Sequence, residues 1–215
     1  MKIKYYGTAA AEGIPGLFCS CEICENARRM GGKNIRTRSQ TVIDDELMID
    51  FSADTYFHVL NYGLDLRKIK ACLITHGHDD HCYPYDFHYR GYGYAYFMNE
   101  NEKIPLEIYS TKNSSNELLP IVEQIKNRDE KSVNWNEIVP FKTYKILDYK
   151  VTPLKADHAK NLDPVIYIIE KDSKAILYAH DTGYFSDETW EYIEKSGIKF
   201  DFVSLDCTSI LNEKA

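Results

Sequence analysis

The amino-acid sequence predicts a layered α/β domain that spans residues 1–215. Short apolar runs that suit buried strands alternate with segments that suit helices, which is the pattern of sheets covered by helices. The chain is long enough for one well-buried domain and too short for two ordinary ones. Hydrophobic residues make up 44% of it and charged residues 27%, the balance of a globular protein rather than a disordered or fibrous one.

Strands are expected where apolar residues run or alternate over short stretches between turn residues. These stretches are Ile3–Tyr5, Gln40–Ile43, Leu47–Asp50, Ala71–Thr75, Leu106–Tyr109, Tyr149–Leu154, Val165–Glu170, Ala175–Tyr178 and Phe202–Leu205. Helices are expected over Asp54–Tyr62, over Ser114–Asn127 and from Ser186 onward. Gly63 ends the first helix, and Ser186 caps the third before an acidic first turn.

The charge balance limits the classes of partner. A net charge of -7 argues against a broad surface that follows the phosphates of a nucleic acid. A local basic patch remains that could meet a small anion, formed by Arg28, Arg29, Lys33, Arg36 and Arg38. No run is long enough to span a membrane, and the chain starts in a strand-like pattern without an apolar signal segment. We therefore expect a cytoplasmic protein; a homodimer stays open.

A loop rich in histidine follows the apolar run Ala71–Thr75. It holds His76, His78 and His81 together with two aspartates, within six positions of the end of a buried strand. Imidazole nitrogen and carboxylate oxygen suit zinc, manganese or iron, and Gly77 lets the backbone turn tightly between two ligands. The density of these residues at a strand end favours a metal site over the alternative, a solvated polar loop.

The pattern His76-x-His78-x-Asp80-His81 resembles the H-x-H-x-D-H signature of the metallo-β-lactamase superfamily. This resemblance covers essentially the whole chain. It implies a four-layer αββα sandwich, in which two mixed sheets pack face to face and the active site lies at the edge between them. The sandwich would lack part of its last C-terminal unit.

The resemblance also implies a set of metal ligands. These are His76, His78, Asp80, His81, His158 and Asp181. The first two histidines and His158 would bind one metal, Asp80 and His81 a second, and Asp181 would bridge both. His158 and Asp181 each follow an expected strand, as this arrangement requires. Two divalent ions, zinc or manganese, would share a hydroxide that attacks phosphorus, and Asp80 could orient the attacking water.

Several positions fall outside the signature or depart from it. His180 stands beside Asp181 where the signature requires no histidine, and we expect it to support the ligands or to pack. The superfamily's last metal-binding histidine follows the strand that corresponds to Phe202–Leu205, but this sequence has no histidine after His180. We therefore expect the metal at Asp80 and His81 to bind more weakly than its neighbour.

Two other histidines are assigned different roles. His58 lies on an expected helix and is interpreted as structural. His88 lies in the tyrosine-rich segment Tyr83–Phe97, which also contains Arg90. The tyrosines, His88 and Arg90 are candidates for contact with the substrate.

Three cysteines form a second cluster. Cys19, Cys21 and Cys24 lie within six positions, which favours metal binding over disulfides in a protein without a signal segment. Three thiolates could hold one structural zinc, which wants a fourth ligand, whereas three buried or free cysteines are the alternative.

With Gly13-Ile14-Pro15 and the arginine-rich stretch Arg36–Gln40, the cysteine cluster resembles the PhnP-like branch, the phosphoribosyl cyclic phosphodiesterases. The pattern also resembles the pyrroloquinoline-quinone biosynthesis protein B, which lacks the intact metal signature. In the PhnP-like branch a histidine after the last strand completes the zinc site, and that histidine is absent from this sequence.

These resemblances imply a metal-dependent phosphodiesterase. Its substrate would be a small cyclic phosphodiester such as a ribosyl 1,2-cyclic phosphate. Two alternatives stay open. One is a nuclease of the same superfamily that acts on RNA, against which the acidic charge balance counts. The other is a metal-binding protein with little turnover because the C-terminal histidine is absent.

Overall fold

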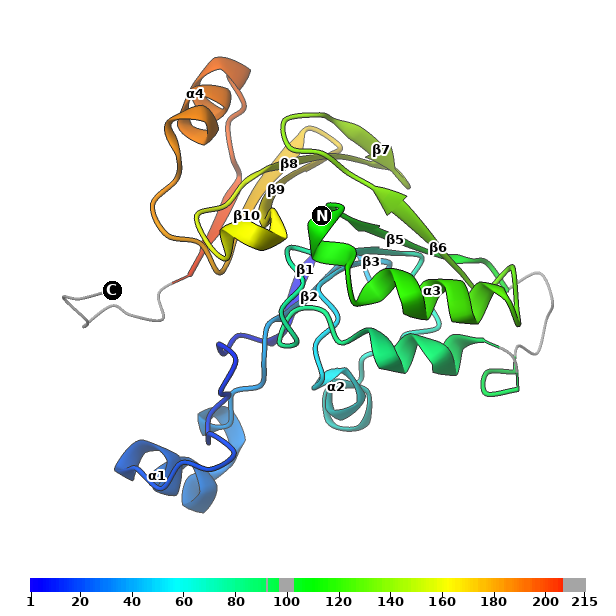
Figure 1. Ribbon diagram of the computed structural model, residues 1–215. Coiled ribbons are helices and arrows are strands. Elements are labelled where there is room, and N and C mark those ends of the chain that lie inside the picture. Colours follow the sequence, from blue (N-terminus) through cyan, green and yellow to red (C-terminus); the bar gives the residue numbers. More distant parts are fainter. Residues whose placement is uncertain (92, 97–102, 207–215) are drawn as a thin grey trace.

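A computed structural model describes residues 1–91, 93–96 and 103–206. Two sheets stack face to face and helices cover their outer faces (Figure 1). In spatial order, the strands of the six-stranded sheet are β1 (Ile3–Gly7), β2 (Gln40–Ile43), β3 (Leu47–Ile49), β4 (Ala71–Leu73), β5 (Leu106–Ser110) and β6 (Val133–Glu137). Those of the five-stranded sheet are β11 (Phe202–Leu205), β10 (Lys174–Ala179), β9 (Val165–Lys171), β8 (Tyr149–Lys155) and β7 (Tyr144–Ile146).

The helices are α1 (Glu22–Met30), α2 (Thr55–Tyr62), α3 (Leu118–Lys126) and α4 (Asp187–Ser196), with short 3-10 turns that include η2 (Pro84–Arg90) and η4 (Asn113–Ser115). None of the helices in the described part of the chain has the length and apolar character of a membrane span. The predicted αββα sandwich is confirmed. That residues 1–215 form a single domain stays a prediction.

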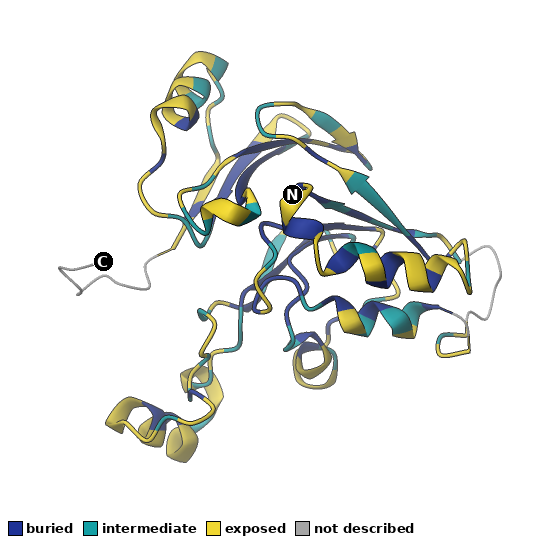
Figure 2. Cartoon of the chain, viewed as in Figure 1, coloured by how far each residue is buried: buried dark blue, intermediate teal, exposed yellow. Residues whose placement is uncertain are grey.

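The strands alternate their side chains between two apolar layers. Ile49 of β3 faces the core between the sheets, where it joins Tyr167 and Ile169 of β9. Met48, one position earlier, faces the opposite way and packs in the layer under α3. On the second sheet, Ile168 points outward toward the layer that includes residues of α4. This period of two is what places one apolar core between the sheets and another under each helical layer, and Figure 2 shows the strands as mostly buried.

Parallel pairing sets where the site can form. β3 pairs with β4, β4 with β5, and β5 with β6, all parallel, whereas β7 to β10 pair antiparallel and β10 with β11 parallel. The carboxyl ends of β3 and β4 therefore meet at one edge of their sheet. The loop after β4 is the histidine-rich loop, so the topology brings it to that edge.

The expected helices form with small differences. Gly63 ends α2 in the left-handed conformation, and the Ser186 hydroxyl accepts a hydrogen bond from the Thr189 amide at the start of α4, as predicted. The expected helix Ser114–Asn127 is divided into η4 and α3. Pro120, in the first turn of α3, has no amide hydrogen to donate to residue 116, which favours an interruption of the helix before it.

Residues 8–38 leave the six-stranded sheet between β1 and β2 and carry α1 away from it, a segment that we call the N-terminal arm (Figure 1). The outgoing and returning segments of the arm are joined by an isolated bridge, where Ile14 and Arg36 exchange backbone hydrogen bonds of 2.8 and 2.7 Å. At its root, the His58 Nδ1 lies 2.6 Å from the Gln40 Oε1 and its Nε2 lies 2.8 Å from the Thr37 Oγ1. His58 is fully buried, in agreement with its interpretation as structural.

Candidate metal centre

Three strand ends deliver the candidate ligands to one edge between the sheets. The loop after β4 carries His76, His78, Asp80 and His81, while His158 follows β8 and Asp181 follows β10. The latter two loops are tied together, because the Thr182 hydroxyl accepts a hydrogen bond of 2.9 Å from the amide of residue 157. Gly77 is required by a close approach: a Cβ at this position would lie 2.8 Å from the backbone oxygen of residue 114.

The first group of donors consists of His76, His78, His158 and Asp181, whose ligand atoms all lie within 4.8 Å of one another. The His78 Nδ1 lies 3.1 Å from the His76 Nε2 and 3.2 Å from the His158 Nε2, although His158 is 80 positions away in sequence. The Asp181 Oδ2 lies 3.3 Å from the Nε2 of both His76 and His158.

These separations fit a metal ion. Four donors that each lie about 2.1 Å from one tetrahedral ion are about 3.4 Å apart, close to the distances between these nitrogens and this oxygen. Ring nitrogens and carboxylate oxygens that converge in this way leave room for one ion at their centre. The donor types suit zinc or manganese.

The second group consists of His76, Asp80 and His81. The His81 Nε2 lies 3.4 Å from the Asp80 Oδ2 and 3.4 Å from the Asp181 Oδ2. The same oxygen of Asp181 therefore faces His76 and His158 on one side and His81 on the other. This position between the two groups is what a bridging carboxylate needs. Metal binding by all six residues stays a prediction.

Asp50 orients His81, and the sequence interpretation missed this role. The Nδ1 of His81 donates to the Asp50 Oδ2 over 2.7 Å, while the Oδ1 accepts from the amide and the hydroxyl of Thr75 at 2.8 and 2.9 Å. Asp50 is fully buried. A carboxylate that holds the far nitrogen of a histidine fixes the ring so that its other nitrogen can bind a metal. Asp50 directly follows β3, the neighbour of β4 in the sheet. Its position at the end of an expected strand was the only signal of this role in the sequence.

The electrostatics of the cluster favour a charged carboxylate at its centre. Burial by itself would raise the pKa of Asp181, but hydrogen bonds with His76 and His81 hold it well below its usual range. Burial opposes protonation of His81, and the charge of Asp50 overcomes this and raises the pKa of His81 to about 10. Burial lowers the pKa of His76. Because a metal ion needs the free Nε2 of His81, metal binding would displace a proton there.

Two clefts border the cluster. A cleft of about 680 Å³ is lined by His81, His180 and Asp181 together with residues of the N-terminal arm, including Glu12 and Arg36. A second cleft of about 610 Å³ lies along the segment that precedes and follows His158.

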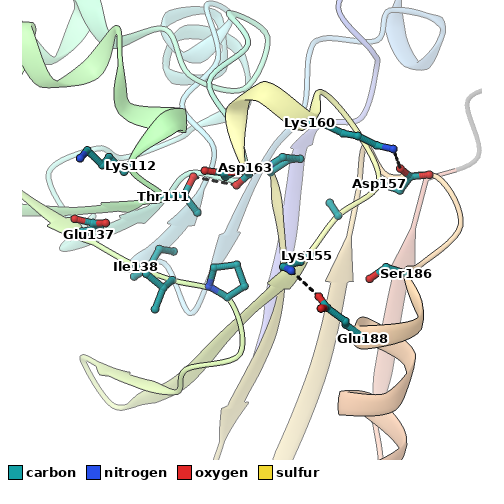
Figure 3. Close-up of a pocket in the computed structure, with 14 residues that line it drawn as sticks. Thr111, Lys112, Glu137, Ile138, Lys155, Asp157, Lys160, Asp163, Ser186 and Glu188 are labelled. Carbon is teal, nitrogen blue, oxygen red and sulfur yellow. Dashed lines mark hydrogen bonds and ion pairs between the residues drawn. The ribbon is translucent and has the colours of Figure 1, made fainter.

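Figure 3 shows two pairs of opposite charges in the second cleft. Lys155 pairs with Glu188 at 2.5 Å, and Lys160 lies 4.0 Å from Asp157. The first cleft, which includes two candidate ligands in its wall, is therefore the better place for a substrate.

The described part of the tyrosine-rich segment lies away from both clefts beside the metal cluster. Its residues 83–91 pack on the helical side of the six-stranded sheet, where Phe87 stacks on Phe51 at 4.1 Å. Arg90 donates to the backbone oxygens of Ser132 and Ile104, at 3.0 and 2.5 Å. No described residue of this segment, His88 included, lines either cleft beside the metal cluster. The expectation that Arg90 grips the substrate is not supported, and Phe97 lies outside the described residues.

The cysteines come together at the far end of the arm. The Sγ atoms of Cys19, Cys21 and Cys24 lie within 4.8 Å of one another, and the Gly16 amide donates to the Cys24 Sγ over 3.3 Å. A hydrogen bond from the Cys24 backbone lowers the pKa of Cys21 to about 7, which favours the thiolate that binds metal. The sequence interpretation did not foresee that Cys24 lies on α1.

The family of the chain follows from comparison with known proteins. Residues 48–214 match the family model of the beta-lactamase superfamily domain, which is more than half of the chain. No curated protein matches the sequence closely enough for comparison.

Solved structures share the fold. Zinc-bound PqqB from Methylobacterium extorquens is 20% identical, with a TM-score of 0.69 and coverage of 96% of this chain and 72% of that one. A diphosphatase from the PhnP family is 20% identical, with a TM-score of 0.62 and coverage of 88% and 68%. Human tRNase Z, short form, is 15% identical, with a TM-score of 0.53 and coverage of 82% and 68%. The chain belongs to the beta-lactamase superfamily, as its H-x-H-x-D-H motif indicated.

Proposed function

We propose that this member of the superfamily hydrolyses a small phosphodiester at a centre of two divalent metal ions. The observation that carries the proposal is the position of the Asp181 Oδ2, which lies within 3.4 Å of ring nitrogens from both donor groups. One carboxylate oxygen between two groups would join two metal sites into one centre. His76, His78 and His158 would hold one ion, Asp80 and His81 the other, and Asp181 both.

Bound ions of this kind lower the pKa of a water molecule and neutralise the charge of phosphate oxygens. The protein's own residues fix the geometry in which this happens. Asp50 holds the ring of His81, and the tied loops hold His158 beside Asp181. Asp80 is nearly buried with its Oδ2 toward His81, so in addition to binding metal it can accept a hydrogen bond from the attacking water.

A small cyclic phosphodiester, such as a ribosyl 1,2-cyclic phosphate, suits the cleft beside the cluster. Its volume of about 680 Å³ is in the usual range for small-molecule sites. Arg36 on its wall adds a positive charge that a phosphate would meet. The net charge of -7 favours a small substrate over RNA. Structural likeness to a diphosphatase of the PhnP family supports chemistry at phosphorus, and a diphosphate belongs among the compounds to test.

The proposal includes a zinc ion at Cys19, Cys21 and Cys24 that would stabilise the arm. Three thiols that converge within 4.8 Å could supply three of its four ligands. Reduced thiols suit a cytoplasmic protein, and we place this protein in that compartment.

The test is steady-state hydrolysis by the purified protein with added manganese or zinc. The substrates are bis(p-nitrophenyl) phosphate, a ribosyl 1,2-cyclic phosphate, a diphosphate and a short RNA. The cyclic phosphodiester is expected to give the highest kcat/KM. His158→Ala removes a proposed ligand and is expected to lower kcat/KM at least about a hundredfold, because one metal loses its position.

The matched control is His88→Ala, which changes the same residue type outside both clefts and should leave the rate unchanged. Preference for RNA would replace the proposal with a nuclease. Tight binding of two metals with no turnover of any compound would favour the metal-binding alternative.

A further inference from the structure

His180 lies at the proposed reaction site without a proposed part in it. It directly precedes Asp181 and lines the same cleft as His81 and Asp181. Neither donor group in the described part of the chain includes it. The imidazole therefore borders the space where a substrate would bind and is not placed to hold either ion.

The ring of His180 is held on several sides. Its Nε2 lies 2.6 Å from the Ser204 Oγ, and the Tyr5 hydroxyl donates to that same oxygen over 2.6 Å. The ring centroid lies 4.2 Å from that of Tyr178 and 5.9 Å from that of Tyr5, with interplanar angles of 32° and 16°. A side chain that is fixed by stacking and by a hydrogen bond loses little further freedom when it meets a ligand.

The hydrogen-bond partners of His180 indicate which of its two ring nitrogens faces the cleft. The Ser204 hydroxyl accepts from Tyr5, and within the described residues its own hydrogen has no acceptor other than the His180 Nε2. If Nε2 accepts, a neutral imidazole carries its hydrogen on Nδ1. The Nδ1 has no partner within the described residues, where the fully buried polar side-chain atoms without a partner are Ser52 Oγ and Ser132 Oγ. The Nδ1–H is therefore open to solvent, and the cleft is the open space that His180 borders.

We propose that His180 donates its Nδ1–H to a phosphate oxygen of the substrate and so positions the phosphodiester at the metal centre. The inference rests on the proposed function, because it assumes a phosphate in this cleft. A neutral donor suits the place, because it binds an oxygen without adding to the positive charge of Arg36 and of the two proposed ions. Arg36 and His180, which both line the cleft, would then contact different oxygens of one phosphate.

Two substitutions of His180 test the roles of its two ring nitrogens separately. The amide of asparagine reaches about as far as Nδ1, so His180→Asn keeps a donor for the substrate and loses the contact with Ser204. The amide of glutamine reaches about as far as Nε2, so His180→Gln keeps the contact with Ser204 and loses the donor. We expect kcat/KM to fall about tenfold or more in His180→Gln and about threefold in His180→Asn. The melting temperature should fall in the opposite order, with His180→Asn the less stable variant.

A merely structural role would make activity and melting temperature fall in the same order, and that result would overturn the inference. Equal kcat/KM in wild type and His180→Gln would overturn it as well. Metal content, measured in each variant, is expected to stay at the wild-type value.

Binding of inorganic phosphate to the metal-loaded protein, measured by calorimetry, separates this inference from the proposed function. His180→Gln should bind phosphate about tenfold more weakly than wild type, and His180→Asn should lie between them. If no phosphodiester is turned over but phosphate affinity follows this order, the proposed reaction is wrong and the role of His180 stands. If wild type turns over the substrate and all three proteins bind phosphate equally, the role of His180 is wrong.

Discussion

The histidine-aspartate cluster and the cysteine cluster are built by different parts of the molecule and are stabilised in different ways. His76 and His81 are buried after a strand, Asp50 holds the ring of His81, and a hydrogen bond ties the loops that carry His158 and Asp181. The cysteines lie on the N-terminal arm, where α1 buries only Cys24 and Ala27. Leu17 and Phe18 beside them are largely exposed to solvent.

This difference has consequences for the proposed ions. The sheets and their cores order the first cluster, so an ion there would find its donors already arranged. The arm has little apolar surface to bury, so an ion at the cysteines would contribute a larger share of the local folding free energy. Loss of the first kind of ion should therefore remove activity, and loss of the second should remove stability.

The largest expected effect comes from Asp181→Asn. The amide keeps the shape of the side chain but removes the negative charge between the two donor groups. We expect kcat/KM to fall on the order of a thousandfold, since the charge that would hold both ions is lost. The melting temperature should change little. Steady-state kinetics and metal analysis check this, with Asp187→Asn at the exposed start of α4 as the matched control.

Calorimetric titration of the wild type sharpens the same prediction. In the proposed assignment one ion has His76, His78 and His158 besides Asp181, whereas the other has Asp80 and His81 besides Asp181. We therefore expect one tight and one weaker ion, and Asp181→Asn should weaken both. Two ions with equal affinity in the wild type, or an unchanged pair in the variant, would show that this ligand assignment is wrong.

The sequence identified candidate ligands that lie together in the structure, but it did not identify the residue that supports them. That these residues bind metal stays a prediction. The motif ligands follow one strand, and His158 and Asp181 each follow another, so local pattern was enough to select them. Asp50 was assigned only as the last residue of a strand. Its role depends on the parallel pairing of β3 with β4, which local sequence does not reveal.

Two strands that the sequence interpretation missed, β6 and β7, have weak apolar patterns. In β6, Asn134 and Asn136 alternate with apolar positions and both donate to the Glu107 carboxylate, which makes an edge strand look like a polar loop. β7 has only three residues. The sequence interpretation also missed α1, because it assigned the cysteines at the start of this helix to metal binding; in the structure α1 buries only Cys24 and Ala27.

An intermediate effect is expected when Cys19, Cys21 and Cys24 are all replaced by serine. One equivalent of zinc should be lost, and the melting temperature should fall by about 5 °C, because the arm loses its internal cross-link. The value of kcat should stay near wild type. KM should rise a few-fold, since Arg36 is held through its pairing with Ile14 on the arm. Ser20→Ala, in the same loop, is the matched control. Unchanged zinc content and melting temperature would rule out the structural ion.

The smallest expected effect concerns the root of the N-terminal arm, where the arm joins the six-stranded sheet. His58 lies there, with hydrogen bonds to Gln40 at the start of β2 and to Thr37 on the arm. Burial lowers the pKa of His58 from 6.5 to about 4. Between these values the unfolded chain binds a proton that the folded chain does not, so the stability contributed by neutral His58 is complete above pH 6.5 and declines as the pH falls toward 4.

Other groups titrate in the same range, so the informative quantity is the difference in melting temperature between wild type and His58→Gln. Glutamine is uncharged at every pH of the experiment and can still bond to Gln40 or Thr37. We expect wild type to be the more stable protein at pH 7.5 and its advantage to shrink by a few degrees at pH 5. A difference that stays constant would mean that His58 does not titrate as its burial requires. If the advantage shrinks while zinc remains bound to the cysteines, the cysteine cluster holds the arm independently of His58, and His58 stabilises only the sheet.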